Sequence, residues 1–141
     1  MSTRASERML RVLRWYLASL YYVKRGDDVT KPLAPVLGET YRCSWQLVRD
    51  TENLGDVTYA AEQVSVNPPV TCVHAECVAS GVEARVRLQP DAFCVGSYVQ
   101  LRLHGLARIH LTQYAEEYAL ELPTGCMRYV KRERDELFDV L

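Results

Sequence analysis

The chain has 141 residues, of which 48% are hydrophobic and 25% are charged, with 17 basic and 18 acidic side chains. This length suits one domain, and the composition excludes a disordered or low-complexity chain. We find no apolar run approaching the roughly 18 residues of a membrane span and no secretory signal, and the net charge of −1 argues against a general nucleic-acid binder.

The charges are unevenly distributed along the chain. Residues 1–31 carry seven basic and three acidic groups, whereas residues 32–127 carry six basic and eleven acidic groups. A cationic N-terminal segment therefore precedes an acidic body, which indicates a surface of uneven electrostatic potential.

Residues 6–25 are predicted to form one amphipathic helix with Ser6 as its N-cap. Apolar side chains recur every three or four residues and form one stripe: Met9, Leu13, Tyr16, Leu20 and Val23. Four arginines lie on the opposite arc: Arg4, Arg8, Arg11 and Arg14. Two roles stay open for these arginines, contact with anionic membrane headgroups or simple exposure to water while the apolar stripe packs on the rest of the domain.

From Thr40 onward the apolar period shortens to two residues, which predicts strands. We expect them at 40–47, 57–65, 70–78, 82–88, 98–103, 106–111 and 118–122. The expected breaks are a turn at 53–56, Pro68 with Pro69, Ser80 with Gly81, Pro90 with Asp91, and Gly105, while Glu116 and Glu117 are expected on a turn. The charged residues 131–141 are expected to form a solvated tail or a short helix. The predicted architecture is one helix followed by an antiparallel meander or part of a barrel.

The chemistry of catalysis is weakly represented. The cysteines are odd in number and include no Cys-x-x-Cys pair, which favours reduced, structural thiols over disulfides or zinc. Cys72 and His74 would share a strand face, but the sequence offers no further group that would activate the thiol as a nucleophile. We therefore expect no enzymatic activity, no metal and no cofactor.

Two segments are more specific than composition alone would produce. Residues 31–40 read KPLAPVLGET, and residues 62–69 read EQVSVNPP. Both resemble the hallmark segments of the oxysterol-binding protein family, in which the first carries Lys-Pro-x-Asn-Pro-x-Leu-Gly-Glu-Thr and the second reads EQVSHHPP. Residues 105–109 and 116–118 are also similar to that family, so the resemblance extends from about residue 8 to about residue 130.

The resemblance implies a lipid-binding domain built around an incomplete antiparallel β-barrel with an apolar tunnel. It makes Lys31 the phosphate-binding lysine and places Leu33 and Ala34 at the tunnel mouth, with Ala34 standing where the family has Asn. Val66 and Asn67 stand where the family has two histidines that contact a lipid headgroup. Valine donates no hydrogen bond and asparagine brings no charge, so we expect phosphoinositide recognition to be weakened and sterol binding to be less affected.

The function predicted from this resemblance is lipid binding and non-vesicular lipid transfer between membranes, by a cytoplasmic protein that is peripheral at membranes. The ligand would be a sterol, phosphatidylserine or phosphatidylinositol 4-phosphate. Because the family's domain is several-fold longer, residues 1–141 are expected to be one truncated lipid-binding domain, with self-association through an open sheet edge. The alternative hypothesis is an interaction module without transport, which pairs through that edge or through the basic helix.

Overall fold

The computed structural model describes residues 4–25, 34–96, 98–131 and 136–140. The chain divides into two units, residues 1–34 and residues 35–141, which we describe separately. The first unit contains helix α1 (Ala5–Arg25). It begins one residue before the predicted start, so Ser6 lies within the first turn and the predicted N-cap is wrong.

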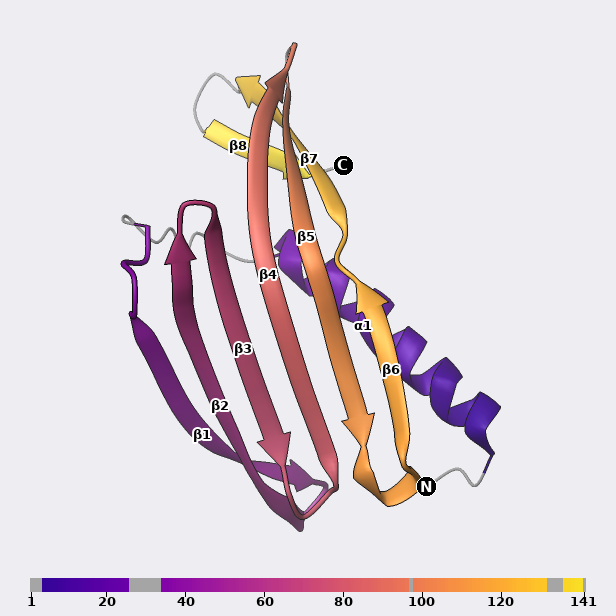
Figure 1. The fold of residues 1–141 in the computed structure, drawn as a ribbon. Coiled ribbons are helices and arrows are strands. Elements are labelled where there is room, and N and C mark those ends of the chain that lie inside the picture. Colours follow the sequence, from indigo (N-terminus) through magenta and orange to yellow (C-terminus); the bar gives the residue numbers. More distant parts are fainter. Residues whose placement is uncertain (1–3, 26–33, 97, 132–135, 141) are drawn as a thin grey trace. The chain divides into compact units, whose positions relative to one another are not determined.

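In the described part of the second unit, eight strands form one antiparallel sheet (Figure 1). They are β1 (Thr40–Arg49), β2 (Glu52–Val66), β3 (Pro69–Cys77), β4 (Val82–Val95), β5 (Tyr98–Leu111), β6 (Glu116–Glu121), β7 (Thr124–Lys131) and β8 (Glu136–Val140). Neighbours follow the order β1-β2-β3-β4-β5-β7-β8, with β6 also paired to β5. The sheet is not closed into a barrel, and the predicted mainly β architecture with an antiparallel meander is confirmed.

Strand β5 differs from the prediction, because it is one long strand where two shorter strands were expected. It runs unbroken through Gly105, so the two strands predicted at 98–103 and 106–111 are one. A Cβ atom at Gly105 would lie 1.8 Å from the Arg87 carbonyl oxygen, and its φ is +137°. Glycine is therefore needed for close approach of two strands here, not for a turn. One edge of β5 pairs with β4, and the other pairs with both β6 and β7.

Three other predicted turns are wrong. The β1–β2 hairpin turns at Asp50, whose φ is 57°, while the predicted turn at 53–56 is the start of β2. Strand β4 continues through Pro90, which pairs with Leu103. The ladder between β3 and β4 ends at Leu88, so Pro90 lies beyond it, where a missing N–H donor is tolerated. Glu116 and Glu117 begin β6 instead of forming a turn. By contrast, the breaks at Pro68 and at Ser80 with Gly81 are confirmed.

The C-terminal region contains two strands that the sequence pattern does not predict, β7 and β8. Residues 136–140 form β8 and pair antiparallel with β7, from Met127 opposite Val140 to Lys131 opposite Glu136. The predicted solvated tail or short helix is therefore wrong for these residues. Their mixed charged and apolar pattern fits an edge strand as well as a helix, and the pairing partner decides between them.

Candidate functional site

Gln63 connects the two hallmark segments. Its backbone carbonyl accepts a 2.8 Å hydrogen bond from the Gly38 N–H, and its backbone N–H donates a 3.0 Å bond to the Glu39 carbonyl. Its side chain, in a residue only 4% exposed, accepts a 2.6 Å bond from the Thr71 hydroxyl and donates a 2.7 Å bond to the Ser65 carbonyl. Buried polar groups need such partners, so this glutamine fixes the LGET segment against β2 and β3.

The segment that resembles the family's histidine pair lies at a hairpin. Val66 ends β2 and is 51% exposed, and it pairs with Pro69 at the start of β3. Asn67 lies in the turn between them, is exposed, and precedes a cis peptide bond to Pro68. Both side chains are thus accessible from solvent at one end of the β2–β3 hairpin.

The other residues predicted to contact the lipid or a membrane lie outside the β2–β3 hairpin. Lys31 and Leu33 lie outside the described residues. Ala34 is described and exposed, and it belongs to the first unit. Of the helix arginines, Arg4 precedes α1, and the other three lie on one arc of it, with Arg8 half-buried and Arg11 and Arg14 exposed. Among the described residues, no helix is long and apolar enough to cross a membrane.

One face of the sheet is apolar, as the alternation along the strands requires. Directly opposed residues share a face, so the register collects the following side chains, which we call the apolar face: Tyr41, Cys43, Trp45, Val57, Tyr59, Ala61, Val73, Ala75, Val82, Ala84, Val86, Ala107, Ile109, Tyr118 and Leu120. Tyr59 makes ring contacts with Tyr41 and Trp45, with centroid distances of 6.1 and 6.5 Å.

The apolar face is incompletely covered. Within the described ranges, Val70, Cys77 and Ile109 are the only buried hydrophobic residues. Trp45 is 47% exposed, and Val73 and Val86 are half-buried. A continuous apolar surface left partly open to water is typical of a surface that contacts another apolar group.

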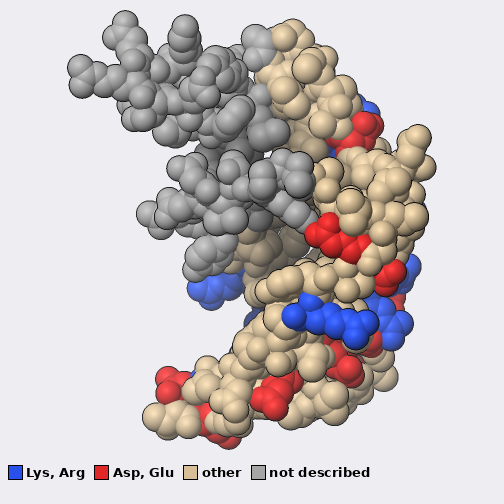
Figure 2. Space-filling model, turned by 90° about the vertical axis from the view of Figure 1, so that its left-hand side faces the viewer, with Lys and Arg blue, Asp and Glu red and all other residues tan. Residues whose placement is uncertain are grey.

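On the opposite face, which we call the polar face, the charged side chains lie in rows that run across the strands. One row contains Arg42, Ala60, His74, Arg85, Arg108 and Ala119, and the next contains Ser44, Thr58, Glu76, Glu83, His110 and Glu117. A basic row therefore lies beside an acidic row. Figure 2 shows basic and acidic side chains lying close together on the surface.

Glu83 is the centre of the contacts between these rows. Its Oε1 lies 2.8 Å from His74 Nε2 and accepts a 2.6 Å hydrogen bond from Arg85 Nε, and His110 Nδ1 is 4.0 Å from Oε2. These bonds from His74 and Arg85 lower the pKa of the Glu83 carboxyl below its ordinary value. Arg108 bonds Glu117 in the same manner on β5 and β6. In the described part of the chain, no group of three His, Cys, Asp or Glu residues is arranged to hold a metal ion.

Sequence reasoning missed two features of this site. In the sequence, Gln63 belongs to a motif, and a glutamine inside an apolar strand is itself a sign of a buried residue with several hydrogen bonds. The basic row was missed because Arg42, Arg85 and Arg108 are far apart in sequence. The period-two run Glu83, Arg85, Arg87 shows one charged strand face, but only the register shows which residues of β3 and β5 lie beside it.

Comparisons with known proteins agree with this arrangement. A family model described as oxysterol-binding protein matches residues 1–134. Oxysterol-binding protein-related protein 9 of Mus musculus is 30% identical over 138 residues, covering 88% of this chain and 19% of that protein. Oxysterol-binding protein-related protein 5 of Homo sapiens is 34% identical over 125 residues, covering 84% of this chain and 13% of that protein.

A solved structure shares the fold. The crystal structure of Osh3 ORD in complex with PI(4)P from Saccharomyces cerevisiae matches with a TM-score of 0.57 and 26% identity, covering 70% of this chain and 24% of that chain. This chain therefore spans about one fifth of the length of the curated relative named first. The family match covers nearly all of its residues, and the two hallmark segments meet at Gln63. The chain belongs to the oxysterol-binding protein family.

Proposed function

We propose that this chain binds a lipid against the apolar face of its sheet and takes part in moving that lipid between membranes. The observation that carries the proposal is the division of the sheet into one apolar and one polar face. Membership of the oxysterol-binding protein family and the similarity to a structure solved with PI(4)P support the same function.

The physical argument rests on uncovered apolar area. Side chains such as Val73, Val86 and Trp45 retain contact with water in the chain by itself. Each Å² of apolar surface removed from water contributes about 25 cal/mol. A sterol or an acyl chain lying along this face would cover these side chains and be shielded by them, so both surfaces gain from the contact.

We propose that the headgroup lies near the β2–β3 hairpin, with Lys31 as its cation and with Leu33 and Ala34 near the opening. Val66 and Asn67 supply at most neutral hydrogen bonds there. Charge-assisted bonds are about twice as strong as neutral ones. This chemistry favours a sterol or phosphatidylserine over a phosphoinositide with its multiply charged headgroup.

Lipid loading tests the proposal directly. The purified chain is incubated with liposomes that contain sterol, phosphatidylserine or phosphatidylinositol 4-phosphate, separated from them, and assayed for bound lipid. Val73→Asn places an amide on the apolar face and should reduce the bound lipid. Thr58→Asn is the matched control, because Thr58 is exposed on the polar face of the neighbouring strand. Absence of bound lipid, or equal loss in both variants, would contradict the proposal.

The exposed edge of β1 supports a second candidate, pairing with another chain. In the described residues β1 pairs only with β2, and its Tyr41, Trp45 and Val48 side chains are exposed. Such edges template further strand pairing. We propose self-association through β1, which sedimentation at several concentrations tests. A mass that stays monomeric at every concentration excludes it. We also propose that the α1 arginines support a peripheral, cytoplasmic association with anionic membranes.

A further inference from the structure

The polar face carries a groove whose arginines the proposed lipid contact does not use. It is an open groove of about 630 Å³ that crosses β1 to β5. Among the described residues that line it, four are arginines, Arg42, Arg85, Arg87 and Arg108, and one, Glu62, carries a carboxylate. A volume of this size lies in the range of small-molecule sites. Most of its lining residues belong to the polar face, and Ala61, Val73 and Val86 of the apolar face also contribute to it, so the arginine side chains lie apart from the proposed lipid contact.

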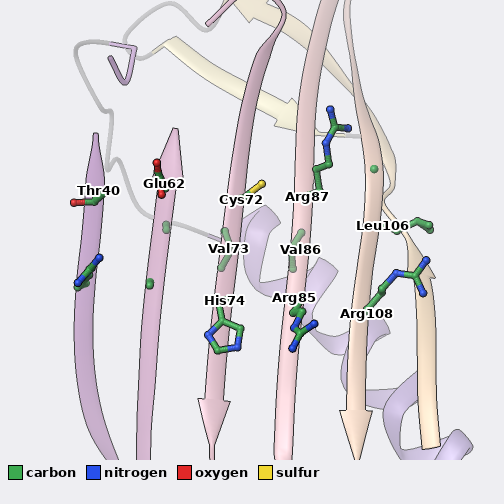
Figure 3. Close-up of a pocket in the computed structure, with 14 residues that line it drawn as sticks. Thr40, Glu62, Cys72, Val73, His74, Arg85, Val86, Arg87, Leu106 and Arg108 are labelled. Carbon is green, nitrogen blue, oxygen red and sulfur yellow. The ribbon is translucent and has the colours of Figure 1, made fainter. Parts of the chain in front are cut away.

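The register brings three of these arginines together. Arg85 on β4 lies directly opposite Arg108 on β5, and Arg87 lies two residues from Arg85 on the same face. Figure 3 shows His74, Arg85 and Arg108 side by side, with Arg87 one row further along β4. Like charges directly opposite each other destabilise a sheet. This pairing therefore needs compensation by negative charge.

Carboxylates of the protein compensate the positive charge of these arginines only in part. Glu83 bonds Arg85 and Glu117 bonds Arg108, and both carboxylates belong to the acidic row outside the lining of the groove. Arg87 lies opposite Leu106 and is exposed, and it has no hydrogen bond or ion pair within the described residues. Arg85 is also 69% exposed at its side chain. Several guanidinium N–H groups are thus left to face the groove.

Gly105 contributes to the shape of this end of the groove. It lines the groove beside Leu106, and its backbone passes so close to Arg87 that a Cβ atom there would lie 1.8 Å from the Arg87 carbonyl oxygen. The missing side chain lets the backbones of β4 and β5 approach each other closely here. Glu62 lies on β2, two strands away from β4, and its charge disfavours an anion at that end.

We propose that Arg85, Arg87 and Arg108 bind a compact phosphate ester in this groove. Guanidinium groups present planar, paired N–H donors that match phosphate oxygens. Arg87 supplies the uncompensated charge, and Arg85 and Arg108 donate the N–H groups that Glu83 and Glu117 leave free. Leu106 and Cys72 line the groove beside them and suit the organic part of the ester.

Calorimetric titration of the full chain with inorganic pyrophosphate at low ionic strength tests the site for a soluble ester. Flotation with phosphatidylcholine vesicles, with and without phosphatidic acid, tests it for a lipid headgroup. Arg87→Gln should weaken the binding by about 10- to 150-fold, which corresponds to the loss of about 1.5–3 kcal/mol for a hydrogen bond to a charged group. Arg49→Gln is the matched control, because Arg49 is exposed on β1 and does not line the groove.

The outcomes separate the sources and the two proposals. Heat with pyrophosphate indicates that the site takes a soluble phosphate, and flotation that needs phosphatidic acid indicates a lipid headgroup. Either result supports the site when only Arg87→Gln weakens the binding. No binding to either probe, or equal loss in Arg49→Gln, overturns it. Circular dichroism checks that each variant is folded. Arg87→Lys keeps the positive charge but lacks the paired N–H donors of a guanidinium, so it should bind the probe with intermediate affinity. Lipid loading of the apolar face should be unchanged in Arg87→Gln, so failure of one proposal leaves the other intact.

Discussion

The carbonyl oxygen of Gln63 accepts a 2.8 Å hydrogen bond from the N–H of Gly38, and this bond joins the two segments by which the family is recognised. The segments are separated in sequence, and two backbone hydrogen bonds of Gln63, to Gly38 and to Glu39, hold them together. The LGET and EQVS segments thus have a structural role in addition to any contact with a ligand. The β2–β3 hairpin that carries Val66 and Asn67 is positioned by the same glutamine.

Gln63→Ala should lower the free energy of unfolding by about 1–3 kcal/mol, because the Thr71 hydroxyl and the Ser65 carbonyl lose their partner next to a buried site. Urea unfolding followed by circular dichroism measures this. Gln46→Ala, at an exposed position of β1, is the control and should change stability by less than about 0.5 kcal/mol. Equal effects of the two substitutions would show that the Gln63 bonds contribute nothing.

Glu83 should make folding sensitive to acid. Its folded-state pKa lies below the ordinary value of 4.5 because of hydrogen bonds from His74 and Arg85. The unfolded chain therefore binds more protons near that pH, and the stabilisation, complete above about pH 5, is lost as the pH falls through the folded-state pKa.

Glu83→Gln should consequently flatten the acid limb of a plot of unfolding free energy against pH. Glu76→Gln provides the matched control, because Glu76 lies directly opposite Glu83 on β3. Its plot should run parallel to that of the unsubstituted chain. An acid limb as steep in Glu83→Gln as in the unsubstituted chain would exclude this role for the carboxylate.

Gly105→Ala should destabilise the sheet, since its Cβ atom would collide with the Arg87 carbonyl at a φ of +137°. Overpacking of this kind costs about 1–3 kcal/mol, and thermal unfolding reports it as a lower Tm. Gly125→Ala is the control, because a Cβ atom at Gly125 would have no neighbour within 4 Å. A Tm unchanged in Gly105→Ala would mean that β4 and β5 separate easily at this point.

Restoring the family's histidine pair should restore phosphoinositide binding. The double variant Val66→His with Asn67→His adds two donors that can carry charge, and binding to phosphatidylinositol 4-phosphate vesicles should strengthen at least about tenfold. Val78→His with Ala79→His places the same residues at the exposed β3–β4 turn and should give no gain. Adding Lys31→Gln to the first variant should remove the gain. A gain that survives this addition would exclude Lys31 as the cation.

The sequence predicts where the helix and the strands lie better than it predicts which strands pair with one another. Period-two alternation located the strands from Tyr41 to Tyr118, and the 3–4 spacing located α1 to within one residue. Gly105 and Pro90 were misassigned as breaks because their local preferences favour turns, whereas pairing across β4 and β5 overrides them. Strands β7 and β8 are both absent from the predicted set, and for β8 the reason is that an edge strand with charged residues is recognised only by its neighbour.

For the candidate site too, the sequence predicts some residues, whereas others become apparent only from the pairing of the strands. Motif letters identified Val66 and Asn67, and these do lie at an accessible hairpin. The arginines of the polar face come from separate strands, so their proximity depends on the register, which local patterns do not determine. Gln63 illustrates the intermediate case, in which a residue is visible in the motif but its partners at Gly38 and Thr71 are not.

The most direct test of lipid contact with the apolar face uses Trp45, which is 47% exposed on that face. The chain has two tryptophans, so Trp15→Phe leaves Trp45 as the sole reporter. Its fluorescence is measured after loading with a phospholipid brominated in its acyl chains, with the unbrominated lipid as control. We predict strong quenching by the brominated chains and none by the control lipid. Bound brominated lipid with unchanged Trp45 fluorescence would contradict the account.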